Sequence, residues 1–243
     1  MSAPAIQRIL WRPWRIALIK PLLTSVGSWT YREGFLVSIE TNSSRGIGEF
    51  APLPSYSKTQ HSDFAAAKSE FPKLLGVDPQ KLWESSLNLS PEANCAVETC
   101  LADILAQQSG KSLAYWLAEE LGTLEPSADI QVNGLIDSNN PDEAQEIATT
   151  LLKAGYKTLK IKVGSSLLKD KQRIRAVRKA VGKDIKIRID ANGSWNFRQA
   201  FTIMKLIERY NIEYCEEALP FKEGKYSTFL RLLHATTKIP LAV

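Results

Sequence analysis

The second half of the chain repeats a strand-like segment at a nearly constant interval. Apolar, strand-like runs begin near Ile130, Lys157, Ile185, Ile212 and Ile239, so successive runs start 27, 28, 27 and 27 residues apart. Each interval contains one pattern with the periodicity of an amphipathic helix. Regular alternation of strands and helices predicts parallel strands joined by right-handed crossovers. The repeat therefore limits this half of the chain to an open doubly wound sheet or a (β/α)8 barrel.

Side-chain alternation within the strands distinguishes between these two folds. In KTLKIKV, Leu159, Ile161 and Val163 alternate with Lys160 and Lys162, and IKIRID alternates in the same way. A strand of an open α/β sheet is covered on both faces and is apolar throughout. In a barrel, apolar side chains face the surrounding helices, and polar side chains face the interior near its mouth. The alternation therefore favours the barrel.

The number of repeats accounts for about half of such a barrel. Four βα units and one further strand are present, whereas a closed barrel of this type has eight strands. We therefore predict an α/β fold in which residues 126–243 form the first half of a (β/α)8-type barrel. The chain is expected to end inside strand five, at Val243, so that the sequence is a fragment of a longer protein.

Residues 1–125 lack the repeat and show strands followed by helices. Strands are expected over 6–19 and 31–41, and the GIGEFAPLP stretch that comes next is too rich in Gly and Pro for a helix. This order predicts an α+β domain, placed as a capping domain in front of the barrel. Its helical patterns lie at roughly 60–71, 91–109 and 112–121.

Composition excludes several classes of protein. With 44% hydrophobic and 23% charged residues, the chain matches ordinary globular proteins and not disordered or disulfide-rich ones. The three cysteines form no CxxC pair, which favours a reducing, cytoplasmic compartment. No apolar run approaches the ~18 residues of a membrane span. We therefore expect no membrane partner.

Basic residues outnumber acidic ones, 31 to 26, and thirteen basic residues lie between Lys153 and Arg188. Such a run could bind nucleic acid. A solvated outer face is the better interpretation, because six of these residues occupy one helix with an apolar opposite stripe and no interleaved aromatic residues. We therefore expect no nucleic-acid partner. The six are Lys169, Lys171, Arg173, Arg175, Arg178 and Lys179.

Charged residues end three consecutive predicted strands, where β/α barrels carry their active sites. The second strand ends with Lys160 and Lys162, the third with Asp190 and Asn192, and the fourth with an acidic pair that begins at Glu216. Each pair alone is an ordinary solvated strand end or turn cap. Amines and carboxylates at matching positions of three successive strands are harder to explain without a function.

These residue types indicate metal-assisted proton abstraction. Asp190 and Glu216, with no His or Cys beside them, suit a hard cation such as Mg²⁺, with Mn²⁺ as an alternative. His61 and His234 lie away from the strand ends, which argues against a His-ligated zinc site. A lysine beside a divalent cation and a second lysine has a lowered pKa and can act as a base. The cation would stabilise the oxyanion formed by proton removal α to a carboxylate.

The order of these motifs resembles the enolase superfamily, and within it the muconate-lactonizing subgroup. That subgroup is similar in having an α+β domain before a barrel with KxK on strand two, DAN on strand three and EE or EQ on strand four. The resemblance implies that Lys162 is the acid/base catalyst and that Lys160 assists it electrostatically. It also implies Asp190 and Glu216 as metal ligands, with Asn192 as a supporting group.

A segment in the N-terminal half narrows this resemblance. GIGEFAPLPSYSKTQ, residues 46–60, is similar to the corresponding segment of o-succinylbenzoate synthases, and VNGLI and DANGSW are similar as well. The resemblance implies that Pro52 and Leu53 belong to a loop that shapes the substrate pocket, and not to a turn that merely closes the domain. It implies Mg²⁺-dependent syn-dehydration of a succinyl-hydroxycyclohexadiene carboxylate to o-succinylbenzoate, in menaquinone or phylloquinone biosynthesis.

Two alternatives stay open at this point. One is dipeptide epimerisation or N-succinylamino acid racemisation, both activities of the same superfamily. The other is an inactive fragment or a basic binding module. The family pattern implies a third metal ligand directly after IPLAV and a partner lysine on strand six, both beyond Val243. We therefore expect these 243 residues alone to bind Mg²⁺ weakly and to show no measurable dehydration.

Overall fold

The chain folds into two compact units, Met1–Ala128 and Asp129–Val243. The division lies close to the boundary expected after residue 125. No helix among the described residues is long and apolar enough to cross a membrane. The computed structural model describes residues 5–24, 27–53, 68–69, 71–123, 126, 129–221 and 226–243.

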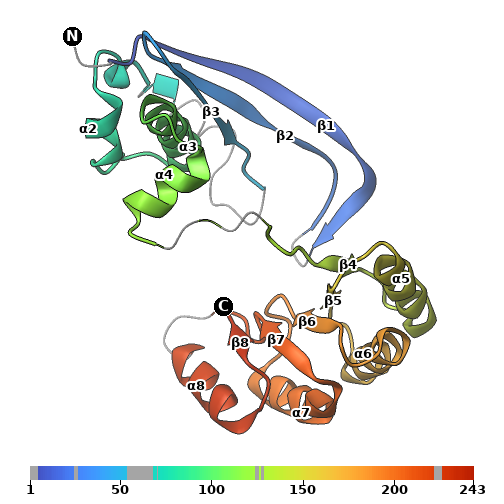
Figure 1. Cartoon of the computed structure of the whole chain (residues 1–243). Helices are drawn as coiled ribbons and strands as arrows, with labels where there is room; N and C mark the ends of the chain where they lie inside the picture. The colour runs from blue at the N-terminus through green and yellow to red at the C-terminus, as the bar shows by residue number, and fades with distance from the viewer. Residues whose placement is uncertain are drawn as a thin grey trace. The chain divides into compact units, whose positions relative to one another are not determined.

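The N-terminal unit is built on a three-stranded antiparallel sheet in which sequence neighbours pair (Figure 1). Strand β1 spans Arg8–Thr24, β2 spans Gly27–Glu40 and β3 spans Arg45–Phe50. The first two are the strands expected at 6–19 and 31–41, with different ends. Strand β3 was not predicted, because the glycines of RGIGEF hide the pattern of a strand.

The glycines of β3 allow a helix to lie directly against the strand. Helix α3, Pro91–Gln108, packs across this part of the sheet. A Cβ atom on Gly48 would lie 1.9 Å from the carbonyl oxygen of Ala96, and one on Gly46 would lie 2.0 Å from that of Cys100. Any side chain would force the two backbones apart, so glycine is required at both positions. The core of this unit forms along the same contact.

Helices α3 (Pro91–Gln108) and α4 (Leu113–Glu120) are the ones predicted at 91–109 and 112–121. Helix α2 was not predicted. It is a single short turn, with Asp78 accepting a hydrogen bond from Gln80 N as its N-cap. The helix expected at 60–71 falls largely outside the described residues. The shorter helical segments that accompany α3 in the described part of this unit are η1 (Phe71–Leu74), α2 (Pro79–Trp83) and α4 (Leu113–Glu120).

The C-terminal unit contains a five-stranded parallel sheet whose strands stand in sequence order, β4-β5-β6-β7-β8. Helices α5 to α8 lie along one side of this sheet (Figure 1). A doubly wound sheet instead reverses its strand order and carries helices on both faces. Consecutive order with right-handed crossovers places the helices on one side, as in a barrel. This arrangement agrees with the partial barrel expected from the sequence.

The bounds of these elements follow the predicted repeat, although the first and last strands are shorter than their apolar runs. The strands are β4 (Gly134–Ile136), β5 (Thr158–Lys162), β6 (Lys186–Asp190), β7 (Ile212–Glu216) and β8 (Leu241–Ala242). The helical segments are α5 (Pro141–Lys153), α6 (Leu167–Val181), α7 (Phe197–Ile207), η2 (Glu208–Tyr210) and α8 (Tyr226–Thr236).

The two faces of this sheet differ as the side-chain alternation predicts. Leu159 and Ile161 of β5 and Ile187 and Ile189 of β6 are fully buried in the core that the helices cover. The intervening residues point to the opposite face, because successive side chains of a strand alternate. That face carries the charged side chains of the strands, including Lys160.

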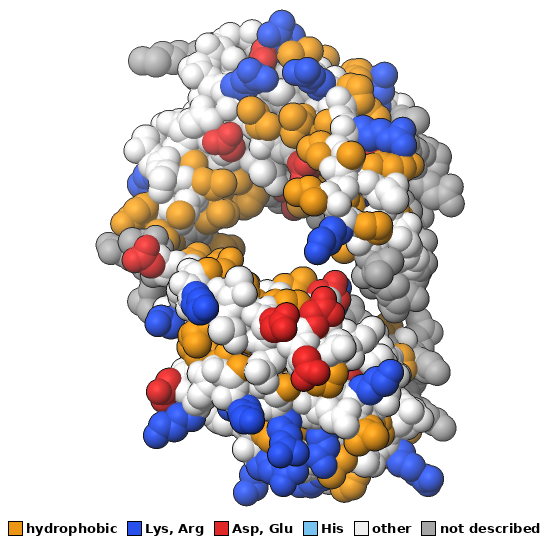
Figure 2. Space-filling view, turned by 90° about the vertical axis from the view of Figure 1, so that its right-hand side faces the viewer, with side chains coloured by type: hydrophobic (Ala, Val, Ile, Leu, Met, Phe, Trp, Pro, Cys, Tyr) orange, Lys and Arg blue, Asp and Glu red, His pale blue; other side chains and the backbone are white. Residues whose placement is uncertain are grey.

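The prediction of a solvated basic face on α6 is wrong for Arg173 and Arg178. Exposed Lys and Arg side chains do gather on the molecular surface (Figure 2). Arg173, however, is 1% exposed. Arg178 is half-buried and donates to the carbonyl groups of Ile185, Tyr210 and Asn211. Both arginines stabilise the fold, because their guanidinium groups donate hydrogen bonds to backbone carbonyls.

Candidate active site

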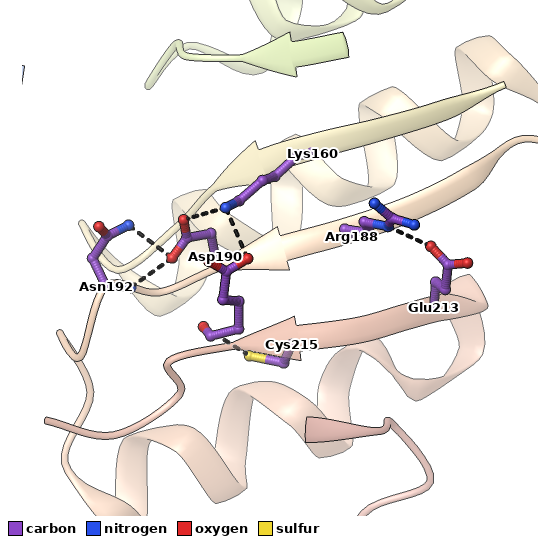
Figure 3. Close-up of polar contacts among 7 residues, drawn as sticks. Lys160, Arg188, Asp190, Asn192, Glu213 and Cys215 are labelled. Carbon is purple, nitrogen blue, oxygen red and sulfur yellow. Dashed lines mark hydrogen bonds and ion pairs between the residues drawn. The ribbon is translucent and has the colours of Figure 1, made fainter. Parts of the chain in front are cut away.

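The amine of Lys160 lies between two carboxylates from neighbouring strands (Figure 3). Its Nζ atom is 2.8 Å from Asp190 Oδ2 and 2.8 Å from Glu216 Oε2. Lys160 lies on β5, whereas Asp190 and Glu216 are the last residues of β6 and β7 and pair in register. The side chain of Asp190 is 9% exposed and that of Glu216 is 34% exposed. The structure thus brings three of the candidate site residues into direct contact.

Asn192 fixes the other oxygen of Asp190. Both its side-chain Nδ2, at 2.8 Å, and its backbone N–H, at 3.0 Å, donate to Asp190 Oδ1 (Figure 3). This contact needs a tight backbone turn after β6, and Asn192 adopts a left-handed conformation with φ of 47°. Asparagine tolerates that conformation better than most residues. Asn192 therefore holds Asp190 so that its second oxygen faces Lys160.

The pairing keeps Lys160 positively charged. Burial alone would lower the pKa of this ammonium, but its hydrogen bonds to Asp190 and Glu216 and their negative charges raise the pKa above its ordinary value. A lysine that holds its proton this firmly suits an electrostatic role. It does not suit the role of a base at neutral pH.

Lys162 lies two residues further along β5, on the same face as Lys160 because strand side chains alternate. It is half-buried, and its Cα pairs in register with that of Asp190. Its amine makes no hydrogen bond or ion pair with another described residue. Of the two lysines, Lys162 is thus the one whose amine is available for proton transfer.

The two carboxylate groups that face Lys160 have oxygen donors of the type that a hard cation binds. Asp190 Oδ2 and Glu216 Oε2 lie within 2.8 Å of the same nitrogen, so both face a point that favours positive charge. Carboxylate oxygens are the ligands that Mg²⁺ prefers, and Mg²⁺ usually keeps several waters. Among the described residues, no three His, Cys, Asp or Glu side chains are grouped to hold a metal. At this point the described part of the chain therefore offers a cation two carboxylate ligands, Asp190 and Glu216.

Pro52 and Leu53 lie in the N-terminal unit, directly after β3. Pro52 is buried, and its carbonyl accepts a hydrogen bond of 3.1 Å from Arg32 Nη1. Arg32 Nη2 donates to the carbonyl of Ala51 at 2.9 Å. Arg32 of β2 therefore fixes Ala51 and Pro52, within the segment that resembles the synthase loop. Residues 54–60 of that segment lie outside the described residues.

Sequence reasoning missed a buried ion pair next to the strand ends. Asp170 and Arg173 are 0% and 1% exposed and pair with each other on α6. The sequence carries a signal for this pair, because Asp170 falls at the helical spacing of the apolar stripe formed by Leu167, Ile174 and Val177. A charged residue on an apolar stripe needs a buried partner. Arg173, one turn along, is that partner.

Comparison with known proteins places this geometry in a family. Residues 142–243 match the family model described as "Enolase C-terminal domain-like", and residues 8–80 match "MenC, N-terminal domain". The crystal structure of the dipeptide epimerase from Cytophaga hutchinsonii, complexed with Mg and the dipeptide D-Ala-L-Val, superposes with a TM-score of 0.81. It is 27% identical in sequence, and the superposition covers 98% of this chain and 64% of that one. Residues 142–243 belong to the enolase superfamily.

Two curated relatives are similar to this chain in sequence. The D-Ala-D/L-Ala epimerase of Cytophaga hutchinsonii is 28% identical over 234 residues, which cover 93% of this chain and 61% of the relative. Protein PHYLLO, chloroplastic, of Arabidopsis thaliana is 29% identical over 236 residues, which cover 88% of this chain and 13% of that protein. The chain therefore spans less than two thirds of the length of either relative.

Proposed function

We propose that Lys162 removes the proton α to a substrate carboxylate, next to a divalent cation held by Asp190 and Glu216. One observation carries this proposal: two carboxylate oxygens converge on the amine of Lys160, on β5, the strand that also presents Lys162. Charge that develops on a substrate carboxylate during proton removal needs a nearby positive group. Lys160, which stays a cation, supplies one from the chain itself.

The chain's own residues divide the remaining tasks. Asp190 and Glu216 bind the ammonium group of Lys160 and would bind the divalent cation. Asn192 orients Asp190. When bound, Mg²⁺ supplies Lewis-acid stabilisation of the negative charge on the substrate carboxylate. Lys162 accepts the proton on its amine, which has no other described partner to displace.

For the substrate, we propose a cyclohexadiene carboxylate that bears a succinyl group and a hydroxyl, which is the o-succinylbenzoate synthase reaction. Lys162 takes the α proton and then protonates the departing hydroxyl on the same face. One C–H bond and one C–O bond break, water leaves, and the ring becomes aromatic. The match of residues 8–80 to the MenC N-terminal domain supports this choice, as does the synthase-like segment that begins at Gly46.

Epimerisation of a dipeptide is the second candidate, with N-succinylamino acid racemisation as its close variant. The similarity to a D-Ala-D/L-Ala epimerase over 93% of the chain favours it. Both reactions begin with the same proton removal by Lys162. They differ in the next step, because the epimerase returns a proton to the α carbon and the synthase expels a hydroxyl.

A substrate panel separates the two candidates. The 243 residues, and the same residues with any coding sequence that continues from Val243, are assayed with the cyclohexadiene substrate, dipeptides and N-succinylamino acids. Each assay is run with MgCl₂ and with EDTA. We expect Mg²⁺-dependent appearance of the aromatic product from the longer protein, and none from the 243 residues alone. Turnover of dipeptides alone would exclude the synthase assignment.

A further inference from the structure

The buried Asp170–Arg173 pair on α6 contacts the end of β5, the strand that carries Lys160 and Lys162. Both side chains are almost fully buried, and the guanidinium group donates to the Asp170 carboxylate. Apolar residues of similar volume often replace such a pair with no loss of stability, because two charges must otherwise be desolvated. Packing alone therefore does not account for a buried ion pair at this position.

Arg173 links the ends of two neighbouring strands. Its Nη1 atom donates to the carbonyl of Ser138, shortly after β4, at 2.6 Å and to the carbonyl of Lys162, the last residue of β5, at 2.8 Å. The planar guanidinium fixes the directions of its donors, which a lysine ammonium does not. The backbone of Lys162 is therefore held at a set distance from the loop after β4.

Asp170 holds the residues that follow Lys162. Its Oδ2 atom accepts a hydrogen bond of 2.9 Å from the N–H of Gly164, and its Oδ1 atom accepts one of 3.4 Å from the hydroxyl of Ser165. Gly164 has a φ of 109°, and a Cβ atom there would lie 2.6 Å from Cβ of Ser194. The loop after β5 thus lies directly against the loop after β6.

We propose that the Asp170–Arg173 pair positions Lys162 for proton transfer. Arg173 binds the carbonyl of Lys162, Asp170 binds the amide two residues later, and together they fix the backbone on both sides of the amine. This inference rests on the proposed role of Lys162 as the base. A displacement of about 1 Å at a reacting group can cost on the order of 10²-fold in rate. The pair acts through Lys162 and makes no contact with substrate in this account.

The test compares two arginines of the same helix. Arg173→Lys keeps a positive charge opposite Asp170 but loses the planar fork that reaches two carbonyls. Arg178→Lys is the matched control. Arg178 also donates to backbone carbonyls, but these belong to residues at the opposite, N-terminal ends of the strands, namely Ile185, Tyr210 and Asn211.

Two readouts are measured on each variant. The first is backbone amide exchange of the peptide that covers residues 160–166, which needs no activity. The second is exchange of the substrate α proton in deuterated buffer, resolved into kcat and KM. For Arg173→Lys we expect amide exchange in 160–166 to rise about tenfold or more. We expect kcat to fall about 10- to 100-fold with KM nearly unchanged. Arg178→Lys is expected to leave both readouts as in the parent protein.

Wild-type amide exchange and kcat in Arg173→Lys would overturn the proposal, as would equal changes in both variants. If Arg173→Lys does not fold, the double variant Asp170→Asn, Arg173→Met removes both charges together, and the same changes are expected of it. If the parent protein, extended by any coding sequence that continues from Val243, exchanges no substrate α proton, the role of Lys162 fails. The amide readout then still decides whether the pair orders the backbone around Lys162.

Discussion

At the scale of single residues, the contacts of Lys160 determine how the candidate site responds to positive charge. Two carboxylates whose oxygens face one point repel each other unless a cation lies between them. Lys160 provides that cation at 2.8 Å from both Asp190 and Glu216. The stability of the strand ends and the affinity of the site for a divalent cation are therefore coupled through one side chain.

Lys160→Met tests this coupling. We expect the variant to lose about 1–3 kcal/mol of unfolding free energy in EDTA, because two carboxylates lose their counter-charge. We also expect millimolar MgCl₂ to raise its Tm more than it raises that of the parent protein. The control is Lys186→Met, since the Lys186 amine is 3.0 Å from Glu213 and the side chain is 61% exposed. Equal Mg²⁺ responses in all three proteins would contradict the coupling.

The buried thiol of Cys100 makes the unfolding free energy depend on pH. Burial raises the pKa of its thiol from 9.0 to about 12. The folded state therefore keeps its proton while the unfolded state ionises, so this thiol lowers stability as pH rises above about 9. Below that pH the thiol makes no such contribution. The stability lost on Cys100→Ala should consequently be about 1 kcal/mol smaller at pH ~10 than at pH ~7, as measured by urea unfolding.

Cys95→Ala is the control for this measurement. Cys95 lies on the same helix and is exposed. The change in unfolding free energy that it causes should be the same at both pH values. A cost of Cys100→Ala that does not change with pH would show that the thiol is not shielded as the structure indicates.

At the scale of elements, the contact between β3 and α3 decides how the N-terminal unit packs. We expect Gly48→Ala to cost about 2 kcal/mol or more, because its Cβ would meet the carbonyl of Ala96 at 1.9 Å and the backbone cannot yield easily. Ile47→Ala is the neighbouring control, since Ile47 is 49% exposed and should change stability much less. Urea midpoints measure both. Similar midpoints for the two variants would contradict the packing.

Helix α5 and strand β3 show which elements could be predicted from the sequence and which could not. Helix α5 lies in an interval where the repeat predicts a helix, and it begins at Pro141 because Asn140 caps it by accepting from two backbone N–H groups. Capping signals of this kind involve residues adjacent in the sequence, so they can be recognised without the structure. Strand β3 was missed because its glycines serve a contact with α3, which is distant in sequence. Tertiary packing, and not local preference, selects those residues.

Arg173 and Arg178 show the same limit on α6. A helix with basic residues between apolar ones predicts a solvated face, and Lys169, Arg175 and Lys179 are exposed as expected. The two arginines are held instead by carbonyl groups from strand ends and turns elsewhere in the unit. Those acceptors become neighbours only when the crossovers close, so helical periodicity could not reveal them.

At the scale of the whole molecule, the order of the strands explains why candidate residues from separate repeats meet. Parallel strands in sequence order bring the carboxyl ends of β5, β6 and β7 to one edge. The position of Asp190 beside Glu216 could therefore be predicted from the repeat alone. The ion pairs of Lys160 and the turn of Asn192 could not, because they depend on side-chain reach and on a φ of 47°.

Substrate α-proton exchange in Lys162→Ala, made in the chain extended by any coding sequence that continues from Val243, tests directly whether Lys162 is the base. The matched control is Lys157→Ala, an exposed lysine just before the same strand. We predict that exchange in deuterated buffer with Mg²⁺ falls by about 10²–10⁴-fold in Lys162→Ala. We also predict that exchange in Lys157→Ala is unchanged and that both variants keep the circular dichroism of the parent protein. Near-parental exchange in a folded Lys162→Ala would contradict this role and show that another residue is the base.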